Sequence, residues 1–209
     1  MKVAVLGGTG SFGRAFAARL LAVGEDEVVI GSRDAERARA TAAELGGGAT
    51  GATNDDAVKG VDLAVLAVKA EGALDTARGI VDALGDTPLL SVASALSFSK
   101  GGVRPDPDAR SLAERIQDLV RGPVVAGLHS IAATNLEAAP PDEDALVCGD
   151  DPAAKTLALE LAGRVVAGRA LDAGPLASAR TLEGLTAVIV NLNRRYKAHA
   201  GVRVSGVGA

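Results

Sequence analysis

A glycine-rich turn near the start of the chain constrains the fold more than any other stretch. The run KVAVL (2–6) is short and apolar, and the turn GGTGSFG (7–13) leads from it into a stretch rich in Ala and Leu that ends at Val23. An apolar run of this length is typical of a buried strand, and the longer stretch after it suits a helix. A glycine turn at that junction either holds an anion or is only a tight corner.

The spacing of the glycines favours an anion site. Gly8, Gly10 and Gly13 match G-x-G-x-x-G, which between a strand and a helix is typical of a dinucleotide-binding βαβ unit. Gly8 would allow the tight turn, Gly10 would let a pyrophosphate approach the backbone, and Gly13 would let the helix pack on the strand. Free N–H groups at the helix start would face the anion, and the hydroxyls of Thr9 and Ser11 would add donors.

The remaining chain alternates apolar runs with helical stretches. We expect strands at 2–6, 27–32, 61–68, 88–94, 122–130 and 145–150, and helices at 13–23, 35–45, 72–84, 109–119, 152–166 and 178–200. This alternation predicts βαβ units, and the near-continuous apolar strands indicate that helices cover both faces of the sheet. We therefore predict an α/β fold, a Rossmann-type doubly wound parallel sheet with a small C-terminal helical extension. The nucleotide-binding domain would span 1–150 and the extension 151–209, with loops at 46–57 and 97–111.

Composition excludes several other classes of protein. A formal net charge of −4 provides no basic surface for a nucleic acid backbone. No apolar run approaches the roughly 20 residues that span a bilayer. Cys148 is the single cysteine, which excludes an internal disulfide and a cysteine-based metal site. Because the chain enters a strand at once, we expect a cytoplasmic protein. From the charge, the apolar runs and the single cysteine we expect no nucleic acid, membrane or metal partner.

The end of the second expected strand indicates which dinucleotide is bound. An NAD site has Asp or Glu there, roughly 20 residues beyond the glycines, to bind the ribose 2′-hydroxyl. This strand ends in IGSR, which places Arg33 20 residues after Gly13. Ser32, Arg33 and Arg37 provide a hydroxyl and two guanidinium groups, which suit a 2′-phosphate. We therefore predict NADP, while Asp34 leaves NAD open as a second cofactor.

The second substrate of such a sheet binds beyond the carboxyl ends of the strands. Ser94 and His129 follow two of the expected strands, and His129 suits a general acid, a ligand anchor or a structural histidine. A carbonyl reductase needs a positioned acid, whereas hydride exchange between two organic cofactors needs mainly stacking, alignment and exclusion of water. The sequence has no Tyr-x-x-x-Lys pair, and this favours exchange between cofactors.

Five stretches carry a resemblance to a known family. They are VAVLGGTGSFGRAFAARL, VVIGSRDAERA, VVAGLHSIAA, VCGDD and LDAGPLASARTLEGLTAVIVNLN, which extend from residue 3 to about residue 193. With them the chain resembles the NADPH-dependent coenzyme F420 reductases, also called F420H2:NADP+ oxidoreductases. The resemblance implies hydride transfer between NADPH and the 5-deazaflavin F420, a small-molecule redox coenzyme.

The resemblance also implies a set of site residues. The expected cofactor-binding residues at the pyrophosphate, which include the motif glycines, are Gly8, Thr9, Gly10, Ser11, Phe12 and Gly13. Those at the 2′-phosphate are Ser32, Arg33 and Arg37. Val68 is expected at the nicotinamide, and Ala133 is a further expected cofactor-binding residue. The expected acceptor-binding residues are Ser94, Ala95, Leu96, His129, Ser130 and Ile131. His129 and Ser94 would be the catalytic residues that position or polarise the deazaflavin. The C-terminal extension would contribute to the acceptor site and form a homodimer.

The residues leave two other functions open. One is an NADPH-dependent reductase of a small imine or carbonyl, with His129 as proton donor. The other is a non-catalytic NADP-binding sensor. Deep burial of His129, with no open pocket beside the nicotinamide position, would favour the sensor.

Overall fold

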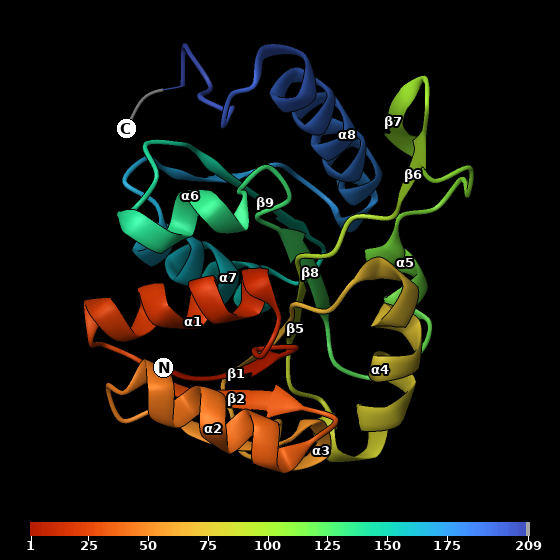
Figure 1. Cartoon of the computed structure of the whole chain (residues 1–209). Helices are drawn as coiled ribbons and strands as arrows, with labels where there is room; N and C mark the ends of the chain where they lie inside the picture. The colour runs from red at the N-terminus through yellow and green to blue at the C-terminus, as the bar shows by residue number, and fades with distance from the viewer. Residues whose placement is uncertain (208–209) are drawn as a thin grey trace.

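Eight strands form one sheet in the computed structural model, which describes residues 1–207 (Figure 1). The strands are β1 (Lys2–Leu6), β2 (Glu27–Ser32), β3 (Thr50–Thr53), β4 (Leu63–Leu66), β5 (Leu89–Ser91), β8 (Val124–Gly127), β9 (Ala145–Gly149) and β10 (Ala170–Asp172). The helices are α1 (Ser11–Val23), α2 (Ala35–Leu45), α3 (Asn54–Ala57), α4 (Ala70–Leu84), α5 (Leu112–Gln117), α6 (Ala133–Ala138), α7 (Pro152–Val165), the 3-10 turn η1 (Leu176–Ser178) and α8 (Ala179–Tyr196). None of the helices in this range has the length and apolarity needed to cross a membrane.

Six of the strands have the order of a dinucleotide-binding sheet. They run β3-β2-β1-β4-β5-β8 and are all parallel, which is the order 3-2-1-4-5-6 of a doubly wound fold. The predicted Rossmann-type architecture is therefore confirmed. The strand order reverses between β1 and β4, so a crevice is expected at their carboxyl ends.

The last two strands differ from the predicted parallel arrangement. β9 is antiparallel to β8, and β10 is parallel to β9, so both run against the other six. The expected boundary after residue 150 falls between β9 and α7, and the sheet continues across that position into β10. Of the expected extension, β10 belongs to the sheet, and η1, α8 and the residues up to 207 follow that last strand.

Both faces of the sheet are buried under helices, as the apolar strands predict. Val3 and Val5 of β1 belong to the cluster formed with α1, α2 and α7. Ala4 and Leu6 of the same strand belong to the opposite cluster, with α4, α5 and the start of α8. Figure 1 shows α1 and α7 on one side of the central strands and α4 and α5 on the other.

The range 46–57, predicted to be a loop, contains β3 and α3. Gly51 in β3 packs so closely on α2 that a Cβ there would lie 2.4 Å from the Ala38 carbonyl. The Thr53 side chain caps α3 by accepting the Asp56 N–H at 3.2 Å. A short edge strand and a one-turn helix lack a periodic apolar pattern, which explains why the apolar periodicity of the sequence does not predict them.

The range 97–111, also predicted to be a loop, begins with a two-stranded antiparallel hairpin, β6 (Leu96–Ser99) and β7 (Gly102–Pro105). The hairpin stands outside the sheet against α8 (Figure 1). The Asn191 side chain of α8 accepts the Val103 N–H at 2.9 Å and donates to the Val103 carbonyl at 2.7 Å. One amide thus pairs both backbone groups of Val103 in β7.

Candidate active site

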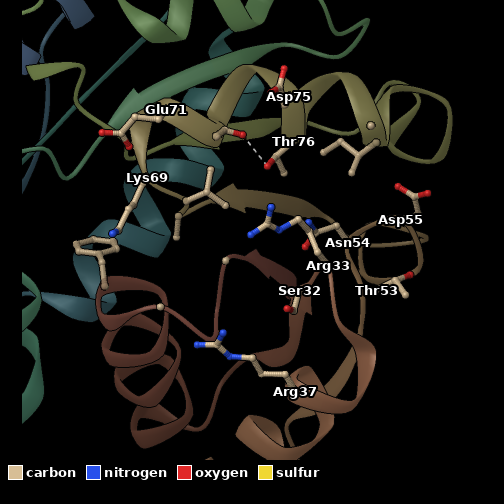
Figure 2. Close-up of a pocket in the computed structure, with 18 of the residues that line it drawn as sticks. Ser32, Arg33, Arg37, Thr53, Asn54, Asp55, Lys69, Glu71, Asp75 and Thr76 are labelled. Carbon is tan, nitrogen blue, oxygen red and sulfur yellow. Dashed lines mark hydrogen bonds between the residues drawn. The ribbon is translucent and has the colours of Figure 1, made fainter.

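A cavity of about 1200 Å³ opens at the carboxyl ends of β1 and β4, where the strand order reverses (Figure 2). Its walls are the glycine loop, the end of β2, the start of α3, the end of β4 and one face of α4. Pockets for drug-sized ligands are usually 300 to 1,000 Å³ by rough measure, so this volume suits a longer ligand. Position and size both match a dinucleotide.

The glycine loop presents backbone N–H groups to this cavity. Gly10 is the N-cap of α1, and no side chain caps that helix. The N–H groups of the first turn therefore remain available to an anion. Gly10, Ser11 and Phe12 line the cavity, whereas Gly8, Thr9 and Gly13 are not among its lining residues.

The other glycines of the loop serve close packing. Gly7 has a φ of 79°, so the left-handed position of the turn is one residue before the first glycine of the motif. A Cβ on Gly13 would lie 2.5 Å from the Gly7 oxygen, and one on Gly8 would lie 2.8 Å from the Val5 oxygen. Any side chain at these two positions would push the strand, the turn and α1 apart.

The end of β2 supplies positive charge that no carboxylate neutralises. Ser32, Arg33 and Arg37 line the cavity, and Figure 2 shows Ser32 and Arg33 at the end of β2 and Arg37 extending toward them from α2. Within residues 1–207 neither guanidinium group forms an ion pair. Asp34 is turned to the start of α2, where Oδ1 accepts the N–H groups of Glu36 and Arg37 at 3.0 and 3.2 Å. The carboxylate that directly follows Arg33 therefore caps a helix.

Three further cavity-lining residues come from the β3–α3 junction. Thr53, Asn54 and Asp55 lie beyond Arg33 at one end of the cavity (Figure 2). Sequence reasoning does not identify them because it predicts a loop over 46–57. The pattern T-x-x-D at Thr53 to Asp56 is typical of a helix N-terminus and could have identified α3.

The end of β4 and the start of α4 complete the cavity at its other end. Val68, Lys69 and Glu71 line it there. Figure 2 shows Lys69 pointing from the start of α4 toward the side of the glycine loop. Within the described chain Lys69 forms no ion pair, so its ammonium group adds a third unneutralised cation to the cavity wall.

The residues expected at the acceptor lie together, but outside this cavity. Ser94, Ala95 and Leu96 follow β5, and His129, Ser130 and Ile131 follow β8, a strand paired with β5. The Thr186 hydroxyl of α8 lies 3.0 Å from Ser94 Oγ and 2.8 Å from the His129 oxygen. None of the six lines the dinucleotide cavity, and Ala133, at the start of α6, does not line it either.

His129 is buried and uncharged at neutral pH. The residue is 7% exposed, and neither imidazole nitrogen forms a hydrogen bond of good geometry with a described residue. Burial lowers its pKa to about 4. A gap with no room for a water molecule lies beside it, lined by Leu182 and Leu185 of α8. A neutral imidazole at this depth is no ready proton donor, so the geometry gives no support to a reductase that uses His129 as its acid.

A second buried titratable group lies on α8. Glu183 is 1% exposed and accepts the Leu112 N–H at 2.7 Å. Burial raises its pKa to about 7, while backbone hydrogen bonds from Leu112 and Ala95 act in the opposite direction. Glu183 therefore connects the start of α5 with α8, next to the segment that contains Ser94.

Comparison with known proteins finds relatives along the whole chain. A family model described as "NADP oxidoreductase coenzyme F420-dependent" matches residues 2–95. The F420-dependent NADP reductase of Methanothermobacter thermautotrophicus is 37% identical, over 99% of this chain and 96% of the relative. The protein of the same name from Methanocaldococcus jannaschii is 31% identical, over 99% of each.

Solved structures agree in fold. A crystal structure from Arthrobacter sp. FB24, provisionally named an F420-dependent NADP reductase, superimposes with a TM-score of 0.83 at 28% identity, covering 98% of this chain and 99% of the other. The pyrroline-5-carboxylate reductase of Coxiella burnetii gives a TM-score of 0.66 at 14% identity, over 94% of this chain and 65% of that one. The second likeness concerns the fold alone.

Proposed function

Because the chain belongs to the family of F420-dependent NADP reductases, we propose that it transfers a hydride between NADPH and the deazaflavin coenzyme F420. Full-length similarity to two such reductases supports this function, since it includes the segments after β5 and β8 as well as the nucleotide-binding half. The observation that carries the choice of NADP is the pair of unneutralised guanidinium groups, Arg33 directly after β2 and Arg37 in the first turn of α2.

The residues present fit the NADP side of this reaction. Ser32, Arg33 and Arg37 would bind the 2′-phosphate by charge-assisted hydrogen bonds. The N–H groups at the start of α1 would bind the pyrophosphate, because Gly10 leaves room for a close approach. The nicotinamide ring would then lie at the Val68 end of the cavity.

On the acceptor side we place the deazaflavin against the segments Ser94–Leu96 and His129–Ile131. The bound coenzymes supply the chemistry, a two-electron hydride exchange, so the chain has to align two rings and exclude water. A neutral, buried His129 suits a site that excludes water, and its backbone carbonyl accepts the Thr186 hydroxyl at 2.8 Å. The sensor alternative requires a buried His129 and also the absence of an open pocket beside the nicotinamide position. His129 is buried, but the cavity is open at Val68, and this disfavours the sensor.

The test is to mix the protein with NADPH and F420 and follow the absorbance of the deazaflavin. We expect the absorbance to fall as F420 is reduced, and to recover when reduced F420 is mixed with NADP. Binding of NADPH is measured separately. If NADPH binds and the absorbance stays constant from about pH 5 to 9, the assignment of F420 as acceptor is wrong.

We also propose a homodimer in the cytoplasm, formed through the C-terminal extension. Val188, Leu192 and Tyr196 follow one another at intervals of four on α8 and are 53%, 42% and 71% exposed. Phe98 of the adjacent hairpin is 70% exposed. Such an apolar stripe on one helix supports a contact with a second copy.

The homodimer is tested by sedimentation of the wild type and of Leu192→Glu. We expect the wild type to sediment as a dimer and the variant as a monomer, because a charge would then be buried in an apolar contact. Glu160→Ala on α7, on a different helix, serves as the control. A wild type that sediments as a monomer at micromolar concentration would contradict this part of the proposal.

A further inference from the structure

The hydroxyl of Thr186 joins the two segments that we place at the acceptor. Thr186 lies in the middle of α8, 92 positions along the chain from Ser94. Its Oγ1 is 3.0 Å from Ser94 Oγ and 2.8 Å from the His129 carbonyl oxygen. One side chain of the C-terminal extension therefore holds the end of β5 and the end of β8 at a fixed separation.

The donors and acceptors in this group can be assigned from the number of hydrogens. A threonine hydroxyl has one hydrogen, and a carbonyl oxygen can only accept. Besides His129, the Leu182 carbonyl of the same helix lies 3.3 Å from Oγ1. The Thr186 hydrogen thus points to a carbonyl, the nearer being that of His129. Ser94 must then donate to Thr186, so its own hydrogen is used and only its lone pairs remain.

Contacts other than the Thr186 hydroxyl also hold α8 in place. One turn earlier, Glu183 accepts the Leu112 N–H at 2.7 Å and fixes α8 to the start of α5. Beyond it, Asn191 pairs with both backbone groups of Val103 in β7. Because α8 is held on both sides of Thr186, this helix sets where its hydroxyl lies.

We propose that Thr186 is a positioning residue for the coenzyme that receives the hydride. Thr186 sets the distance between the Ser94 and His129 segments, and it leaves the Ser94 hydroxyl able only to accept a hydrogen bond from that coenzyme. The ligand group that suits such a hydroxyl is an N–H on the rim of a flat ring, as in a cyclic imide. That the bound coenzyme is F420 rests on the proposed function. The coupling between the two segments rests on the hydrogen bonds alone and can be tested separately.

Three variants separate the hydroxyl from the rest of the side chain. Thr186→Val keeps the shape and removes the hydroxyl, and Thr186→Ser keeps the hydroxyl. Thr156→Val on α7 is the matched control, because its exposed hydroxyl bonds only the Pro152 carbonyl of its own helix at 2.9 Å. Thr186→Ala replaces the valine variant if that one does not fold.

The first measurement is steady-state kinetics with F420 and NADPH. We expect Thr186→Val to raise the KM for F420 about tenfold, which corresponds to about 1.4 kcal/mol, and to leave the dissociation constant of NADPH unchanged. Thr186→Ser should recover wild-type values within about twofold. Equal losses for both coenzymes, or no loss for F420, would overturn the positioning role.

The second measurement is hydrogen exchange without any coenzyme. Peptides covering 92–99 and 128–134 should exchange faster in Thr186→Val than in Thr186→Ser, while peptides of the glycine loop should not change. Unchanged exchange in both segments would overturn the coupling. If F420 is not reduced by the wild type but the exchange differs as expected, the function is wrong and the coupling stands. If Thr186→Val and Thr186→Ala both fail to fold, the hydroxyl serves stability and the positioning role is refuted.

Discussion

Replacing Glu183 by Gln should change how the stability of this protein depends on pH. The carboxyl group is buried, and its pKa is about 7 in place of the usual 4.5. Between these two values the folded protein keeps a proton that the unfolded chain has lost. Its contribution to stability is therefore complete below pH 4.5 and disappears as the pH rises through 7, by about 3 kcal/mol.

His129 acts with the opposite sign over nearly the same range. Its pKa of about 4 lies below the usual 6.5, so between these values the unfolded chain binds a proton that the folded protein does not. The contribution of this residue is complete above pH 6.5 and is lost as the pH falls through 4, again by about 3 kcal/mol. In the wild type the two effects largely cancel from pH 4.5 to 6.5.

Urea unfolding of the wild type and Glu183→Gln between pH 4.5 and 7.5 tests this reasoning. The free energy of unfolding of the variant minus that of the wild type should rise by about 3 kcal/mol over this range. The corresponding difference for His129→Gln should fall by a similar amount. Because each value is the difference in unfolding free energy between variant and wild type, the contributions of all other titrating groups cancel. A Glu183→Gln difference that stays constant with pH would refute the assignment of a protonated, buried carboxyl.

Two further predictions concern the nucleotide half. Arg33→Ala should weaken NADPH binding by roughly 1.5–3 kcal/mol and NADH binding much less, since only NADPH has a phosphate there to lose a charge-assisted contact; equal losses in two fluorescence titrations would place the phosphate elsewhere. Gly13→Ala should destabilise the fold by roughly 1–3 kcal/mol, because its Cβ would lie 2.5 Å from the Gly7 oxygen. Gly163→Ala in α7, where the nearest atom is 3.9 Å away, should leave thermal unfolding unchanged or raise the melting temperature.

The NADP side could be predicted from sequence because its parts are local. The glycine loop and the Ser32–Arg33 pair each follow directly from a strand, and the parallel sheet brings adjacent strand ends together. α3 was missed because one helical turn has no apolar period, although it lines the cavity. The burial of His129 could not be predicted either, since it depends on α8, whose Leu182 and Leu185 lie against the imidazole.

The cap that Asp34 forms links cofactor preference to stability. In the folded chain its carboxylate accepts two N–H groups at the start of α2, and losing such a cap costs about 1 kcal/mol. Removing Arg33 and Arg37 would therefore abolish the 2′-phosphate site without releasing an acid to bind a ribose. A change of preference from NADP to NAD needs a new carboxylate at the end of β2, with Asp34 left in place. Loss of the two arginines alone would thus leave a protein that binds neither cofactor well.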